Sequence, residues 1–120
     1  MRSDQLRARC LAKVGATEDF PFGEEVSVFK VGGKIFAISD LGGDPLEVSL
    51  KCDPEFAEAL RTQHSAIRTG YHLNKRHWNT VTLDGSLDDD DVDGMLDDSY
   101  DLVVASLSRG QRHGLGLAPP

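Results

Sequence analysis

The sequence has few cysteines, no long apolar run and few basic residues relative to acidic ones, and each shortage excludes a class of protein. Its two cysteines, Cys10 and Cys52, form no C-x-x-C pair, which argues against a zinc framework and a disulfide scaffold. No apolar run approaches the roughly 18 residues of a membrane helix, and the N-terminal stretch lacks the apolar centre of a signal peptide. We therefore expect a soluble, cytoplasmic protein that does not contact a membrane.

Acidic residues outnumber basic ones, 20 against 13, and the formal net charge is −7. This charge opposes nonspecific coating of nucleic acid, because such binding depends on Lys and Arg displacing counterions from phosphates. However, nine of the 20 acidic residues lie between residues 84 and 101, a segment without Lys or Arg. The remainder of the chain is slightly basic, so a nucleic-acid site elsewhere is compatible with the composition.

The first half of the chain shows a helix and then a hairpin. Ser3 can cap a helix that Gly15 ends, and Phe20 and Phe22 are expected to pin the following loop onto the core. The pair Gly32-Gly33 favours a type I′ turn between two strands, with Phe29 opposite Phe36. This register predicts two apolar faces, one with Phe29, Val31, Phe36 and Ile38, the other with Val26, Val28, Ile35 and Ala37.

A third strand and a second helix follow. Residues 46–51 alternate strictly between apolar and polar side chains, which is typical of a strand with one wet face. Asp53 and Pro54 are a typical helix start, and the apolar side of that helix would carry Phe56, Ala57, Ala59 and Leu60.

Residues 66–83 read as a second hairpin, joined by the short turn Asn74 to Arg76. In its second strand Val81 and Leu83 would face the core, which turns Trp78 to the opposite face. Ser86 with Asp89 resembles a capping box, and helical periodicity continues to about Ser108.

These elements predict one α+β domain over residues 1–108 and a flexible C-terminal tail over 109–120. The expected order is α-β3-α-β2-α, with a mainly antiparallel five-stranded sheet in two layers.

Motifs for metals and cofactors are incomplete. Asp89, Asp91, Asp93 and Gly94 partly match a calcium loop, but Tyr100 stands where the bidentate glutamate is needed. No spacing of His, Cys or carboxylates fixes a transition-metal site, and no nucleotide-binding glycine loop occurs. We therefore predict no metal, no cofactor and no catalytic residue, and favour a protein that is not an enzyme.

The second hairpin holds the richest set of polar side chains. Cations there can bind phosphates and aromatic rings can stack on bases. The candidate residues for nucleic-acid or ligand binding are Arg68, Tyr71, His72, Asn74, Lys75, Arg76, His77 and Trp78. The alternatives are a charged hairpin tip without function, a protein adaptor or homodimer that uses the apolar face around Val28 and Ile35, and a small-ligand or enzyme site around His72, Lys75 and His77.

Three segments together resemble the MmcQ/YjbR family of small bacterial proteins, namely "ATEDFPFGEEVSVFKVGGKIFA", "VSLKCDPE" and "GYHLNKRHWNTVTLDGS". The resemblance extends from about Cys10 to Leu107. It implies the α-β3-α-β2-α order, a fold grouped with type III secretion chaperones, and a largely uncharacterised function for which "double wing" DNA binding has been suggested. The wing residues would then be Asn74 to Trp78, with Gly32 to Lys34 at the other tip. The acidic run in residues 87–98 departs from the family and opposes nonspecific DNA binding.

Overall fold

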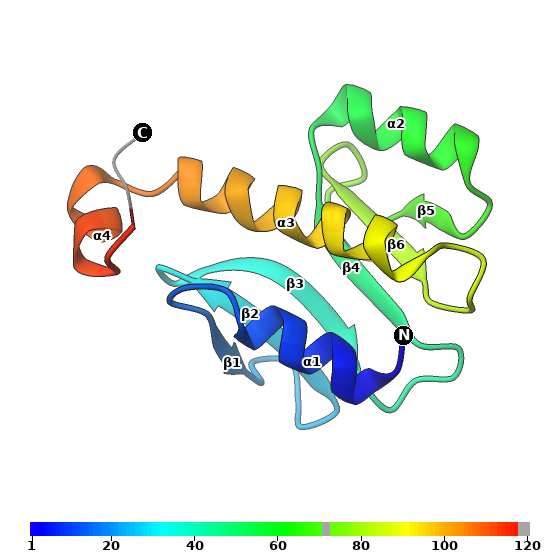
Figure 1. The fold of residues 1–120 in the computed structure, drawn as a ribbon, viewed down its shortest axis with the longest axis horizontal. Coiled ribbons are helices and arrows are strands. Elements are labelled where there is room, and N and C mark those ends of the chain that lie inside the picture. The colour runs from blue at the N-terminus through cyan, green and yellow to red at the C-terminus, as the bar shows by residue number, and fades with distance from the viewer. Residues whose placement is uncertain (71–72, 118–120) are drawn as a thin grey trace.

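The computed structural model describes residues 1–70 and 73–117 of the chain. These described residues form four helices and six strands, which are arranged in two layers (Figure 1). In chain order they are α1 (Ser3–Leu11), β1 (Thr17–Asp19), β2 (Val26–Val31), β3 (Lys34–Asp40), β4 (Glu47–Lys51), α2 (Pro54–Gln63), β5 (Ile67–Thr69), β6 (Trp78–Thr82), α3 (Asp89–Ala105) and α4 (Arg109–Gly114). The α+β class is confirmed. The expected number of five strands is wrong, because β1 adds a sixth.

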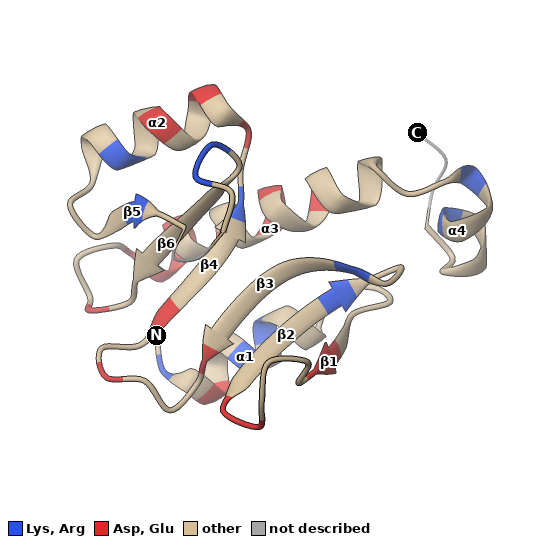
Figure 2. Cartoon of the chain, turned by 180° about the vertical axis from the view of Figure 1, so that it is seen from behind, with Lys and Arg blue, Asp and Glu red and all other residues tan. Residues whose placement is uncertain are grey.

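The strands form one sheet in the order β1-β2-β3-β4-β6-β5, and every neighbouring pair is antiparallel. Helices α1 and α3 lie against one face, and Figure 2 shows the opposite face with the strands in front of them. We call this second face the back face. Among the described residues no helix is long and apolar enough to cross a membrane.

The additional strand β1 lies in the segment expected to be a loop. Glu18 pairs with Phe29 across β1 and β2, and Arg7 of α1 binds the Glu18 carboxylate at 2.7 Å. The neighbouring Phe20 and Phe22 are 47% and 65% exposed, so they do not pin this segment onto the core. The reason is that β1 is held by backbone pairing and an ion pair, which leaves both rings outside the sheet.

The first hairpin has the predicted turn but a different register. Gly32 and Gly33 both have positive φ angles, 58° and 79°, as a type I′ turn requires. A β-bulge then leaves Phe36 without a partner, so Phe29 pairs with Ala37 instead of Phe36. Because one extra residue reverses the alternation, Ala37 joins the core and Ile38 turns to the back face, the opposite of the prediction.

The two halves of the sheet meet at β3 and β4, which pair only through Ala37 with Leu50 and Ile38 with Ser49. Ser99 of α3 is fully buried beside this short ladder. Its hydroxyl donates to the Phe36 carbonyl at 2.6 Å and accepts from the Lys51 N–H at 2.8 Å. A side chain from α3 therefore bridges backbone groups of the two strands beyond the end of their ladder.

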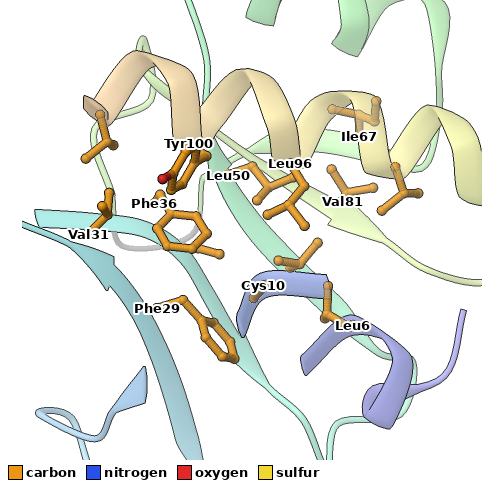
Figure 3. Packing of buried hydrophobic residues seen from close by; sticks show 14 of the residues in the cluster. Leu6, Cys10, Phe29, Val31, Phe36, Leu50, Ile67, Val81, Leu96 and Tyr100 are labelled. Atoms are coloured by element: carbon orange, nitrogen blue, oxygen red, sulfur yellow. The ribbon is translucent and has the colours of Figure 1, made fainter. Parts of the chain in front are cut away.

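The hydrophobic core lies between the sheet and helices α1 and α3 (Figure 3). Phe36 and Tyr100 meet edge to face, with ring centroids 5.4 Å apart, and the Tyr100 hydroxyl donates to the Val14 carbonyl at 2.5 Å. From α2, Ala57 is fully buried as predicted, whereas Phe56 is 59% exposed, which corrects its assignment to the apolar side. The Asp53 cap is confirmed, since its carboxylate accepts from the Glu55 N–H at 3.1 Å.

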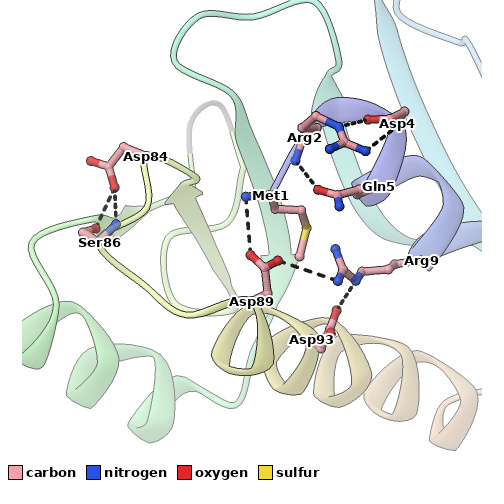
Figure 4. A network of polar contacts seen from close by, with 9 residues as sticks. All are labelled: Met1, Arg2, Asp4, Gln5, Arg9, Asp84, Ser86, Asp89 and Asp93. Atoms are coloured by element: carbon pink, nitrogen blue, oxygen red, sulfur yellow. Dashed lines mark hydrogen bonds and ion pairs between the residues drawn. The ribbon is translucent and has the colours of Figure 1, made fainter.

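Ion pairs connect the acidic segment of α3 to α1 (Figure 4). The Asp89 carboxylate lies 3.4 Å from the Met1 ammonium, Arg9 binds Asp93 at 2.9 Å, and Lys13 binds Asp97. These aspartates are four residues apart, so they occupy one side of α3. The acidic run is therefore helical and not a calcium loop.

Both ends of α3 differ from the prediction. The N-cap is Asp88, and Ser86 instead bonds to Asp84 in a local turn, so the predicted capping box is wrong. The helix ends at Ala105, and the segment expected to be an unstructured tail contains α4. Ser108 and Gln111 form a capping box there, a short local signal that helical periodicity does not reveal.

Candidate nucleic-acid interface

The second hairpin is wider at its tip than predicted, because β5 ends at Thr69 and β6 begins only at Trp78. Gly70 extends the pairing by donating its N–H to the Trp78 carbonyl at 2.9 Å. A Cβ atom at Gly70 would lie 2.7 Å from the Trp78 Cβ, so glycine is needed for this close approach. Tyr71 and His72, two of the candidate residues, lie outside the described residues.

A tight turn at residues 74–77 presents the cations. The Asn74 carbonyl accepts from the N–H groups of His77 and Trp78, at 3.2 and 3.0 Å, and its side-chain oxygen accepts from the Arg76 N–H at 2.9 Å. Asn74 is thus a structural residue of the turn, consistent with its preference for such positions. The side chains of Lys75 and Arg76 are exposed, and within the described chain neither forms an ion pair or a side-chain hydrogen bond.

His77 and Trp78 connect the turn to the sheet. The His77 carbonyl accepts from the Cys52 N–H at 2.7 Å, and Trp78 pairs with Lys51 at the end of β4. Both His77 and Trp78 are half-buried. The side chain of Trp78 faces the back of the sheet, as the alternation predicts, because the neighbouring Asn79 packs toward α2 through the Ala57 carbonyl.

Arg68 differs from the other candidates because it is already paired. Its guanidinium binds the Glu47 carboxylate in a bidentate manner, and Thr82 donates to the same carboxylate at 3.1 Å. These contacts, led by the Arg68 hydrogen bond, hold the pKa of Glu47 below its usual value. Arg68 is therefore not brought together with Lys75 and Arg76 as a phosphate ligand.

A cavity of about 640 Å³ lies on the back face beside this hairpin. Its polar lining includes Ser49 and Thr80, whose hydroxyls bond to each other at 2.8 Å, and the Glu47–Arg68 pair. Its apolar lining consists of Phe22, Val26, Ile38, Pro45 and Leu73. The sequence did not suggest this cavity, because it forms where both hairpins and the loop before β4 converge.

The charges of the back face are unevenly distributed (Figure 2). Basic residues (blue) occur in the turn after β5 and at the adjoining end of β4. Acidic residues (red) occur at the opposite end of β4 and in the loops below it. The basic end corresponds to Lys51, Lys75 and Arg76, and the acidic end includes Asp40 and Glu47. An anionic ligand is therefore favoured at the turn, away from the acidic end of the cavity.

Two other kinds of site were considered, a metal site and an apolar interface around Val28 and Ile35. The described residues contain no group of three His, Cys, Asp or Glu side chains able to hold a metal ion. Val28, part of the apolar face suggested for an adaptor, is fully buried, and Ile35 is half-buried. A protein partner on that face would therefore not reach Val28.

Comparisons with known proteins agree on the family. The family model described as YjbR matches residues 11–102. The uncharacterized protein YjbR of Escherichia coli K12 is 40% identical over 112 residues, which cover 93% of this chain and 95% of that protein.

Solved structures agree as well. A Deinococcus radiodurans protein with a DUF419 domain superposes with a TM-score of 0.91 at 43% identity, covering 98% of this chain and 89% of that one. A Pseudomonas syringae protein gives a TM-score of 0.74 at 27% identity, covering 86% and 99%. The family resemblance carried by the three sequence segments is thereby confirmed, and this chain belongs to the YjbR family.

Proposed function

We propose that this protein is a non-enzymatic binding module that binds DNA at the turn of its second hairpin, through Lys75, Arg76 and Trp78. The observation that carries the proposal is the pair of exposed cations at residues 75 and 76, which have no acidic partner among the described residues. Unpaired cations on a projecting turn can contact phosphates without first breaking an ion pair. Trp78 beside them offers a ring on which a base can stack.

The acidity of the chain is less of an obstacle than its net charge suggests. Asp89, Asp93 and Asp97 are paired with cationic groups in α1 or next to its ends, and they belong to a helix on the face opposite the back face. Exposed charges farther apart than about 10 Å are strongly screened at 0.1 M salt. Close to the turn, the cations Lys75 and Arg76 within it and Lys51 beside Trp78 outnumber the carboxylate of Asp53, which follows the Cys52 bonded to His77.

The test is a titration of a labelled single-stranded oligonucleotide, followed by fluorescence anisotropy at several salt concentrations. Lys75→Ala/Arg76→Ala should weaken binding and reduce the slope of log K against log salt by about 1.4, since each phosphate contact on a single strand contributes roughly 0.7. Trp78 is the only tryptophan, so its fluorescence reports directly on stacking at the site.

A matched control removes two cations elsewhere. Arg2 and Arg109 are both exposed and lie in or next to helices outside the second hairpin. Arg2→Ala/Arg109→Ala changes the net charge by the same amount, so it should leave the slope nearly unchanged. If both double variants weaken binding equally, or if the wild-type protein does not bind even at low salt, the proposed function is wrong.

A further inference from the structure

A second surface lies between α2 and α3, on the helical side of the molecule. One hollow of about 330 Å³ is bordered by Cys52, Phe56 and Leu102, and a second of about 240 Å³ by Phe56, Leu60 and Met95. Phe56 borders both hollows, which are therefore parts of one groove along the two helices. Figure 1 shows α2 running alongside α3. We call this surface the α2–α3 groove.

The α2–α3 groove exposes apolar side chains that its neighbours do not cover. Phe56 is 59% and Leu102 is 37% exposed, whereas most apolar residues of the two helices are buried or half-buried. Gly94 also lines the groove, and a Cβ atom added there would meet nothing within 4 Å. Exposed apolar side chains beside a hollow are typical of a surface that binds a partner.

Apart from His64, the ionisable side chains of Asp, Glu, Lys and Arg type that border the groove are all acidic. The aspartates bordering the two hollows are Asp53, Asp90, Asp91, Asp98 and Asp101, and no Lys or Arg borders them in the described chain. None of these aspartates forms an ion pair within the described residues, unlike Asp89, Asp93 and Asp97, which face α1. Burial, with a smaller effect of Asp98, raises the pKa of the Cys52 thiol, so the thiol stays neutral and belongs to the apolar lining.

We infer that the α2–α3 groove binds a Lys- and Arg-bearing amphipathic helix of a partner protein. Positive charges on such a helix complement the acidic rim, and its apolar stripe supplies anchors for the hollows beside Phe56 and Leu102. A strand is disfavoured because both walls are helices, which have no row of free backbone N–H and C=O groups to pair with.

The described C-terminal residues 109–117 are not the occupant. Helix α4 follows the far end of α3, and Leu115 packs against Gly15 in the turn after α1, since a Cβ atom at Gly15 would lie 3.0 Å from the Leu115 side chain. The groove length is set by α2, whose ten residues span about 15 Å. An occupant of about three helical turns would fill it.

The experiment is a selection from a display library of random peptides of about 15 residues on the intact protein, with counter-selection against Phe56→Ala. Enriched sequences should carry several Lys or Arg residues and apolar residues at i, i+3 or i+4, and i+7. An enriched synthetic peptide should lose at least about tenfold in affinity on Phe56→Ala, since aromatic side chains at the centre of an interface are typical hot spots of binding. Asp98→Asn/Asp101→Asn should weaken the same peptide and reduce the salt dependence of its binding.

Matched variants separate the groove from general surface effects. Phe22→Ala removes an equally exposed ring on the back face, and Glu24→Gln/Glu25→Gln removes two exposed acids from a loop. Both should leave peptide affinity unchanged. Gly94→Gln should obstruct the groove without strain and lower the affinity.

Three results would overturn the inference: no enrichment over an unrelated protein, enriched sequences without net positive charge, or equal peptide affinity of the wild type and Phe56→Ala. Sedimentation that shows a dimer abolished by Phe56→Ala would also overturn it, because the occupant would then be a second copy of this chain. Loss of DNA binding alone leaves the groove unaffected, because Lys75 and Arg76 do not border it.

Discussion

Replacing Ser99 with alanine is expected to destabilise the protein by about 2 to 6 kcal/mol. The substitution removes one oxygen atom, so the cavity it leaves is small and the cost comes mainly from hydrogen bonds. The Ser99 hydroxyl satisfies the Phe36 carbonyl at 2.6 Å and the Lys51 N–H at 2.8 Å, and the residue is fully buried. Each buried backbone group left without a partner costs about 1 to 3 kcal/mol.

The loss of the Ser99 hydroxyl should also weaken the junction between β3 and β4. Strands β3 and β4 share only the pairs Ala37 with Leu50 and Ile38 with Ser49, so the hydroxyl is the next link between the two halves of the sheet. Without it the Lys51 amide should exchange with solvent faster than in the wild type. The change should be smaller for amides of β2, which lies one strand away from the junction.

Urea unfolding followed by circular dichroism measures the free energy of unfolding, and amide exchange by NMR measures the local effect. Ser65→Ala is the matched control, because Ser65 is exposed and makes no side-chain hydrogen bond in the described part of the chain. The reasoning would be refuted if the free energy of unfolding of Ser99→Ala lies within about 0.5 kcal/mol of the wild-type value, which is the usual range for surface substitutions. That result would mean that the strands pair directly or that water replaces the hydroxyl.

The other predictions concern single positions. Gly94→Ala should raise the melting temperature and stabilise the protein by about 1 kcal/mol, since the added methyl meets nothing within 4 Å and alanine favours a helix; a lower melting temperature would contradict this. Gly32→Ala should lower the urea midpoint more than Gly33→Ala, because both have positive φ but only at Gly32 would the Cβ approach Leu107, at 2.7 Å; equal midpoints would show that this contact relaxes freely. Arg68 lowers the pKa of Glu47 in the folded state, so the stabilisation from this pair is present above the unfolded value of about 4.3 and is lost as pH falls through the folded value; Glu47→Gln should make the urea midpoint less sensitive to pH over that range, and an unchanged profile would argue against it.

Features set by a few adjacent residues were predicted from the sequence. The Gly32-Gly33 turn, the Asp53 cap and the burial of Val48 and Leu50 all have local causes, namely positive φ, a side-chain acceptor and strict alternation. Each of these three features is present in the structure as the sequence pattern predicts. These features were sufficient to indicate an α+β fold with an antiparallel sheet.

Features that depend on distant contacts were missed. The bulge at Phe36 exchanges the faces of Ala37 and Ile38, and the Phe36 carbonyl is held by Ser99, 63 positions later in the chain. The sequence of β1 gives little indication of a strand, because the strand is held by distant contacts. Glu18 binds Arg7 of α1, and β1 pairs with β2. Neither effect is visible in a window of neighbouring residues.

The positions of the candidate residues were predicted in part for the same reason. Alternation correctly turned Trp78 to the back face, and the turn does expose Lys75 and Arg76. Arg68 was grouped with them because it is basic, but its ion pair with Glu47 depends on the register of β4 against β6 and β5. The cavity next to it requires the same long-range arrangement.

The acidic helix α3 shows how composition alone misjudges a charged segment. Successive helical residues are about 100° apart, so aspartates that are adjacent in sequence serve different surfaces. One row, spaced by four, meets Arg9 of α1 and Lys13 just after that helix, which are also four residues apart. The same spacing of opposite charges was present in the sequence and could have predicted that α1 and α3 lie side by side. The aspartates that are unpaired within the described residues border the α2–α3 groove instead, so the acidic charge of α3 is divided between two surfaces of the helix.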